Sequence, residues 1–114
     1  MNSEFISKCI ASAEERCSRV PREVMNIQGF SGAKTRHLYN NLCSFRKPDG
    51  SETEYLEIGT FAGSTFVSAL YGNGHVFGTG IDNFTELTEG AYGDPKDDFF
   101  RNVSTFLEPD QGHS

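Results

Sequence analysis

The segment that decides the fold is residues 54–84, EYLEIGTFAGSTFVSALYGNGHVFGTGIDNF. It opens with a short apolar run bounded by turn-forming residues, which predicts a β-strand. The glycine-containing loop 59–63 follows, and residues 64–71 carry apolar side chains at helical spacing. Residues 76–81 then predict a second strand. A strand, a glycine loop, a helix and a strand make a βαβ unit, so we expect two parallel strands joined by a right-handed crossover.

Helices are predicted on both sides of this unit. Residues 3–20 place apolar side chains on one helical stripe, and Pro21 ends the predicted helix. Because free cysteine is among the most buried residue types, we expect the two cysteines of this stripe to be core residues. The stripe consists of Phe5, Ile6, Cys9, Ile10, Ala13, Cys17 and Val20.

Residues 33–45 predict a second helix, with Ser31 as its expected N-cap. A last helix is predicted to open at Asp94-Pro95 and to end before Pro109, with Phe100 on its apolar face. We therefore expect one α/β domain with three parts. These are a helical segment (1–53), the βαβ unit (54–84), and a loop followed by a helix (85–114).

Composition limits the classes of protein to which the chain can belong. With 114 residues, of which 36% are hydrophobic, it suits a single domain with a thin core. The formal net charge of −6 argues against duplex nucleic acid as a partner, because binding phosphates requires clustered lysine and arginine. No apolar run is long enough to span a membrane, and the N-terminus lacks the layout of a secretory signal. We expect a cytoplasmic protein without a membrane partner.

The spacing of the cysteines and histidines does not indicate a metal-binding site. The three cysteines are odd in number and contain no C-x-x-C pair, which argues against a disulfide framework and a zinc site. The histidines are too widely spaced for a metal cluster. We therefore expect no bound metal. The residues concerned are Cys9, Cys17, Cys43, His37, His75 and His113.

The ligand site is expected where the two parallel strands end, because ligands of such sheets bind beyond the carboxyl ends of the strands. Gly59 and Gly63 allow sharp turns and a close approach of the backbone. The N–H groups of Ser64 and Thr65, which open the predicted helix, present a partial positive charge to a carboxylate or phosphate. Asp82 lies 19 residues beyond Gly63 and is placed to accept hydrogen bonds from ribose hydroxyls. These residues predict an adenosine-containing ligand.

Glu57 distinguishes this site from an ordinary dinucleotide fold. It interrupts the apolar strand two residues before the glycine loop. A buried carboxylate is costly unless a cation or a hydrogen-bond donor meets it. A positively charged ligand group would be such a partner, and the alternative is that Glu57 accepts backbone N–H bonds from its own loop.

Residues 55–65 together with residues 80–84 resemble the first and second cofactor motifs of class I S-adenosylmethionine-dependent methyltransferases. The match is closest to the small-molecule branch, whose first motif reads E-x-G-x-x-x-G-x-[ST]. Residues 29–42 carry a weaker resemblance to the helical segment that precedes the first strand in some members. The resemblance implies a partial Rossmann-like methyltransferase fold that binds S-adenosylmethionine and transfers its methyl group to an unknown acceptor.

The resemblance also implies roles for individual residues. Glu57 would face the methionine and sulfonium side of the cofactor, and Ser64 and Thr65 would meet its carboxylate. Asp82 would take the ribose hydroxyls, and Phe84 would offer a ring face to the adenine. The implied cofactor-binding residues are Glu57, Gly59, Thr60, Phe61, Gly63, Ser64, Thr65, Asp82, Asn83 and Phe84.

The resemblance ends near residues 111–114, where a third strand would be about to begin. Family members usually continue with the half that supplies the acceptor pocket, the general base and any catalytic metal ligands. We therefore expect an incomplete domain whose isolated chain lacks the means for methyl transfer. The first strand is normally central in the family sheet, so one of its edges would be unpaired here, which favours self-association.

Two other functions are compatible with the sequence. Residues 78–83 imitate the dinucleotide motif G-x-G-x-x-G, but Asn83 replaces the third glycine and the loop 59–63 has the wrong spacing. An NAD(P)-binding Rossmann fragment is therefore a weaker match. A non-enzymatic module that binds a nucleotide or a partner protein also stays open, because fold does not determine function. Binding of S-adenosylhomocysteine, of NAD or of neither would distinguish the three.

Overall fold

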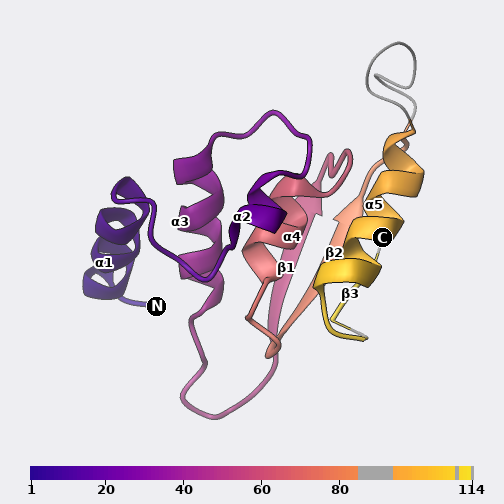
Figure 1. Ribbon diagram of the computed structural model, residues 1–114. Coiled ribbons are helices and arrows are strands. Elements are labelled where there is room, and N and C mark those ends of the chain that lie inside the picture. The colour runs from indigo at the N-terminus through magenta and orange to yellow at the C-terminus, as the bar shows by residue number, and fades with distance from the viewer. Residues whose placement is uncertain (85–93, 110, 114) are drawn as a thin grey trace.

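The computed structural model is a layered arrangement of helices against a small sheet (Figure 1). It describes residues 1–84, 94–109 and 111–113. Figure 1 shows α1, α3 and α4 side by side, followed by the strands and α5. The elements are α1 (Ser3–Glu14), α2 (Arg22–Met25), α3 (Ala33–Cys43), β1 (Thr53–Ile58), α4 (Ser64–Leu70), β2 (Val76–Ile81), α5 (Pro95–Phe106) and β3 (Gly112–His113).

The sheet has the order β1-β2-β3, and both pairs of neighbouring strands are parallel. β1 and β2 are aligned over their full lengths, from Thr53 beside Val76 to Ile58 beside Ile81. The predicted βαβ unit with parallel strands is confirmed, and the predicted bounds of β2 agree with the structure. β3 is a strand of two residues that pairs with the middle of β2.

α4, which connects β1 to β2, and α5, which follows β2, cover the same face of the sheet. A side chain at Gly78 would collide with Leu70 of α4, and one at Gly80 would press on Phe99 of α5. Glycine at these two positions lets the helices lie close to β2. The buried core lies between this sheet face and the helices. It consists of Val20, Val24, Ile27, Phe66, Val67, Leu70, Val76, Phe99 and Leu107.

The predicted N-terminal helix is wrong in length. α1 ends at Glu14, and Arg16 turns the chain with a positive φ of 55°. α1 packs mainly against α3, so one narrow side of it is buried, which includes Cys9. Cys17 falls in the turn and is exposed, which corrects its assignment to the core.

Two further helix predictions need correction. Gly32, and not Ser31, is the N-cap of α3, and it provides no side-chain hydrogen bond. The Ser31 hydroxyl instead bonds to Thr65 and accepts a bond from Arg36. On α5, Phe100 is exposed although the sequence places it on the apolar stripe, because the core lies on the side of Phe99.

The C-terminal end of α4 is buried, so its free carbonyl groups need partners inside the protein. Three buried amide side chains supply them. Asn40 donates to the carbonyls of Ser68 and Tyr71, at 2.7 and 2.8 Å. Asn73 donates to the carbonyl of Ala69, and Gln111 to that of Leu70. The amides come from α3, from the turn after α4 and from the segment before β3, so one helix end joins three parts of the chain.

We predict that Asn40→Ala destabilises the protein by about 2–4 kcal/mol, because two buried carbonyls lose their donor and the backbone N–H of Arg19 loses its acceptor. The free energy of unfolding, measured in urea, tests this. Asn41→Ala is the control, since Asn41 also donates two bonds but at a less buried place on the same helix. Equal losses for the two variants would contradict the prediction.

Candidate functional site

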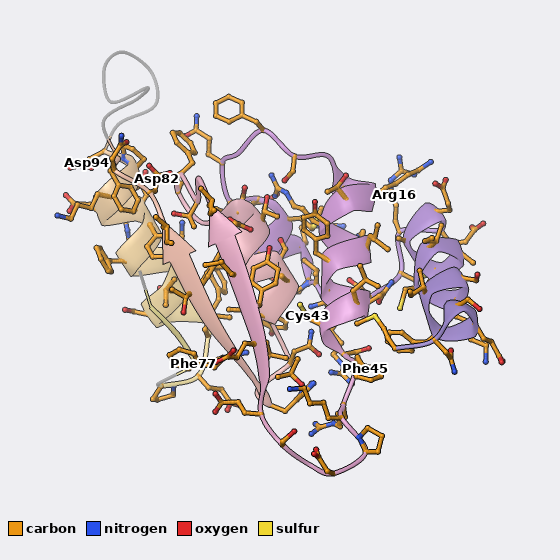
Figure 2. All side chains as sticks on the ribbon, turned by 180° about the vertical axis from the view of Figure 1, so that it is seen from behind. Arg16, Cys43, Phe45, Phe77, Asp82 and Asp94 are labelled. Atoms are coloured by element: carbon orange, nitrogen blue, oxygen red, sulfur yellow. The ribbon has the colours of Figure 1, made fainter. Side chains whose placement is uncertain are left out.

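Asp82 joins two loops at the carboxyl end of the parallel strands. One carboxylate oxygen accepts the backbone N–H of Phe61 at 2.8 Å, and the other accepts that of Phe84 at 2.7 Å. Phe61 belongs to the bend after β1, and Phe84 follows β2. Figure 2 shows Asp82 at the arrowhead end of the strands. The predicted position of Asp82, at the end of the second strand, agrees with the structure.

The same two phenylalanines adopt a backbone conformation that is unusual for residues with side chains. Their φ angles are positive, 49° at Phe61 and 57° at Phe84, and such residues cost about 1–3 kcal/mol each. A hydrogen bond to a charged group contributes about 1.5–3 kcal/mol. The two bonds to Asp82 are therefore large enough to hold both residues in place. Gly59 and Gly63, with φ of 84° and 93°, supply the other left-handed positions of the bend.

A cavity of about 500 Å³ lies beside this carboxylate, within the range of small-molecule sites. Five residues that the sequence implied line it, namely Gly59, Phe61, Asp82, Asn83 and Phe84. The structure adds Phe30, Ile58, Ile81 and Pro95. The wall is mainly apolar and aromatic, and among the described residues that line it Asp82 is the only titratable one.

Phe30 is the cavity residue that sequence reasoning missed. Its ring is 66% exposed, yet its centroid lies 5.2 Å from that of Phe61, so the two rings share the cavity wall. Phe30 lies more than twenty residues before β1, in a loop without a periodic pattern. Its position between Gly29 and Gly32 was the available signal, because close backbone approach is a common reason for glycine in a loop.

The other five implied residues do not line this cavity. Gly29 packs on the start of α4, where an added Cβ atom would lie 2.7 Å from that of Ser64. Thr65 shares a 2.7 Å hydrogen bond with Ser31 of the same loop. The start of α4 is thus covered by the loop around residue 30. The five residues are Glu57, Thr60, Gly63, Ser64 and Thr65, and their ligand roles stay predictions.

A buried cation lies beneath this loop. Arg36 donates to the hydroxyl of Ser31 and to the carbonyls of Met25 and Ile27. Burial lowers the pKa of Arg36, but a guanidinium stays charged at neutral pH. No carboxylate of the described residues forms an ion pair with it. Within the described part of the chain, the guanidinium next to this loop is therefore bonded only to neutral oxygen atoms.

Glu57 lies on the helix-covered face of β1, level with Gly80, and does not line the cavity. Tyr55, two residues earlier and hence on the same face, donates its hydroxyl to Glu57 at 2.6 Å. This partner within the protein was not among those suggested by the sequence, and the contact with a positively charged ligand group stays a prediction. Burial raises the pKa of Glu57 to about 7, although the bond from Tyr55 lowers it. Burial, and secondarily the Glu57 charge, raises the pKa of the Cys43 thiol to about 12, so this thiol is unreactive.

We predict that Glu57 makes stability fall as pH rises. Because its pKa is raised above the ordinary 4.5, its contribution is complete below about pH 4.5 and is lost as pH rises through about 7. Glu57→Gln should be more stable than the parent at about pH 8, by on the order of 2 kcal/mol, and similar to it at about pH 4. Urea unfolding at both pH values measures this. The exposed Glu54→Gln is the control on the same strand, and an unchanged pH profile in Glu57→Gln would refute the prediction.

We predict that Gly29→Ala destabilises the loop over α4. Its methyl group would overlap with Ser64, so we expect a loss of about 1–3 kcal/mol. Gly32→Ala is the matched control, because its methyl group meets no atom within 4 Å and its φ of −77° suits alanine. We expect it to cost less than about 1 kcal/mol as a lost N-cap glycine. Thermal unfolding of both variants is the measurement, and equal midpoints would disprove the predicted contact.

Two other kinds of site find no support in the described part of the chain. No three histidine, cysteine or acidic side chains of the described residues gather closely enough to hold a metal ion. Within residues 1–84, 94–109 and 111–113, no helix has the length and apolar character needed to cross a membrane. The aromatic cavity is therefore the feature from which a function can be argued.

Comparisons with known proteins add no relative. No family model matches the chain, and neither a curated protein nor a solved structure is significantly similar to it. Any function for the cavity must therefore be argued from its own residues.

Proposed function

We propose that the chain binds S-adenosylmethionine in the aromatic cavity and is the cofactor-binding part of a Rossmann-like methyltransferase. The observation that carries the proposal is the position of Asp82. Its carboxylate lies at the carboxyl end of β2, faces the bend after β1, and borders a cavity of about 500 Å³. In open parallel sheets such an acid, following a glycine-containing bend, suits ribose hydroxyls.

The contacts within the site are compatible with this ligand. Each oxygen of Asp82 accepts one backbone bond and can accept another, so the ribose could be held without breaking the bonds to Phe61 and Phe84. The ring of Phe84 would pack on the adenine, next to Asn83. The second group of rings in the lining, Phe30 and Phe61, would then enclose the adenosyl group from the loop side.

The carboxylate of the methionine part would lie toward Thr65. The Thr65 hydroxyl is bonded to Ser31, which in turn accepts a bond from buried Arg36. A guanidinium that forms no ion pair with the described residues favours an anion nearby, and a shift of the loop around Gly29 would give access to it. Glu57 stays a predicted contact of the sulfonium side, because its side chain now bonds Tyr55.

When bound, the cofactor would supply an electrophilic methyl group to an acceptor that the chain does not identify. The described residues would then hold the cofactor and orient its methyl group, because a fixed distance and alignment lower the barrier of methyl transfer. Among the described lining residues Asp82 is the only titratable one, and the proposal assigns it to the ribose hydroxyls, so no lining residue is left to remove a proton from an acceptor.

This shortage of catalytic groups favours a second candidate function. A non-enzymatic module that binds an adenosine-containing ligand needs the ring contacts and Asp82, but it needs no base. A dinucleotide cofactor has less support, because the bend after β1 lacks the glycine spacing of that motif.

We predict that Asp82→Ala weakens S-adenosylhomocysteine binding about 10- to 100-fold, as expected for the loss of charged hydrogen bonds. Asp82→Asn should lie between the parent and the alanine variant, because it keeps one acceptor oxygen. Isothermal titration calorimetry measures the affinities. Asp97→Ala, which removes an exposed carboxylate from α5, is the control and should bind as the parent does.

The outcomes separate the candidates. Equal affinity of the parent and Asp82→Ala for S-adenosylhomocysteine would show that Asp82 does not bind the ribose. Circular dichroism would show whether each variant is folded. If the chain binds NAD but not S-adenosylhomocysteine, it is an NAD(P)-binding fragment and the proposal is wrong. Binding of neither compound would overturn it.

A further inference from the structure

A second cavity lies at the amino end of the parallel strands. Its volume is about 410 Å³, within the range of small-molecule sites. It is lined by residues of the loop 46–52, which leads into β1, and of the turn 74–75, which leads into β2. Figure 2 shows Phe45, next to this loop, at the other end of the strands from Asp82. Because a strand of six residues is about 20 Å long, this cavity is separate from the aromatic one.

The lining of this second cavity is polar, so its chemistry differs from that of the aromatic cavity. Pro48 is the only described lining residue with a purely apolar side chain larger than hydrogen. A ligand that is itself charged and polar suits such a lining, because an apolar ligand would leave the polar side chains without partners. We call it the polar cavity, and its lining consists of Arg46, Lys47, Pro48, Gly50, Ser51, Glu52, Gly74 and His75.

Two cations line the polar cavity. Arg46 and Lys47 are exposed, and neither forms an ion pair with a described residue. Asp49 lies between them and β1 in the sequence but does not line the cavity, and its carboxylate accepts the N–H of Ser51 at 2.8 Å. A guanidinium binds phosphate through paired hydrogen bonds, and an ammonium group adds a point charge. The two cations therefore indicate a phosphate group as the anionic part of a ligand.

The loop that carries these cations is held in place without a ligand. Gly50 donates its N–H to the carbonyl of Lys47 at 3.0 Å, and its φ of 75° suits the end of such a turn. Nε2 of His75 lies 2.9 Å from the carbonyl oxygen of Phe45, which joins the loop to the turn before β2. A preformed site loses less conformational entropy when it binds a ligand.

The lining also contains acceptors that need donors. Because a carbonyl oxygen only accepts, the bond to Phe45 places the proton of a neutral His75 ring on Nε2 and leaves Nδ1 as an acceptor. Nδ1 is buried and has no partner among the described residues, which is costly for a polar atom. The carboxylate of Glu52 is a second acceptor in the same lining. The ligand should therefore carry hydrogen-bond donors as well as an anionic group.

We propose that the polar cavity binds a phosphate monoester of a polyhydroxylated compound, such as a sugar phosphate. Arg46 and Lys47 hold the phosphate, and Glu52 and His75 accept hydrogen bonds from hydroxyl groups of the ester. The volume favours an ester over free phosphate, because a cavity of small-molecule size leaves room beside the anionic group. The site lies at the opposite end of the strands from Asp82, so it does not depend on the proposed binding of S-adenosylmethionine.

Isothermal titration calorimetry with glucose 6-phosphate and glycerol 3-phosphate as probes tests the site. The parent should bind at least one of them, and the double variant Arg46→Gln/Lys47→Gln should bind it at least about tenfold more weakly, as expected for lost charge-assisted bonds. Arg22→Gln/Lys96→Gln is the matched control, because it removes the same two charges from exposed places on α2 and α5. It should bind as the parent does.

Inorganic phosphate as a separate probe tests the hydroxyl-binding part of the site. It should bind the parent more weakly than the ester does, because it lacks the hydroxyl groups. Glu52→Gln should raise the affinity for inorganic phosphate by removing a repelling charge, and should lower the ratio of ester affinity to phosphate affinity. Asp82→Ala should keep the parent's affinity for the ester. Failure of this site is thereby distinguishable from failure of the cofactor site.

Four results would overturn the inference. The first is that the parent binds neither ester. The second is equal affinity of the parent and of Arg46→Gln/Lys47→Gln for the ester, with both chains folded by circular dichroism. The third is that inorganic phosphate binds as tightly as the ester, because the ligand would then be free phosphate. The fourth is tighter binding of glutamate than of either ester, which would assign the polar cavity to an amino acid.

Discussion

The buried carbonyl groups at the C-terminal end of α4 need hydrogen-bond donors from other parts of the chain. α4 lies between the sheet and α3, so water cannot satisfy the groups that a helix leaves unpaired at its end. Asn40, Asn73 and Gln111 meet this requirement from three separate parts of the chain. Because an unpaired buried carbonyl costs much of the stability of a small domain, the position of α4 fixes where α3 and β3 can lie.

The site depends on this placement. With α4 held between α3 and the sheet, the loop between α2 and α3 lies over the start of α4, where Gly29 meets Ser64. That contact brings Phe30 to the cavity and Ser31 to Thr65. The cavity therefore includes a residue of the helical segment 1–53 as well as residues of the βαβ unit, although both expected cofactor motifs lie within the βαβ unit.

Local sequence patterns correctly predicted the features of the fold that are determined by residues close together in the sequence. The bounds of β2, the parallel pairing and the place of Asp82 follow from short apolar runs and a glycine bend, which need few distant contacts. The errors arose where distant contacts decide. Cys17 fits a helical stripe, yet the chain turns at Arg16, and Ser31 fits a cap, yet it bonds across to Thr65. The partner of Glu57 could have been found, because Tyr55 is two residues away on the same face of a strand.

Gln111 performs two tasks that are usually separate. Its side chain donates to the carbonyls of Leu70 and Asn73, while its own carbonyl accepts the N–H of Gly78 on β2. Fraying of the short third strand would thus remove a cap from the central helix at the same moment. The β3 edge of the sheet and the C-terminal end of α4 consequently open as one cooperative unit. The slowest-exchanging amide hydrogens of both should therefore gain or lose protection from hydrogen exchange together.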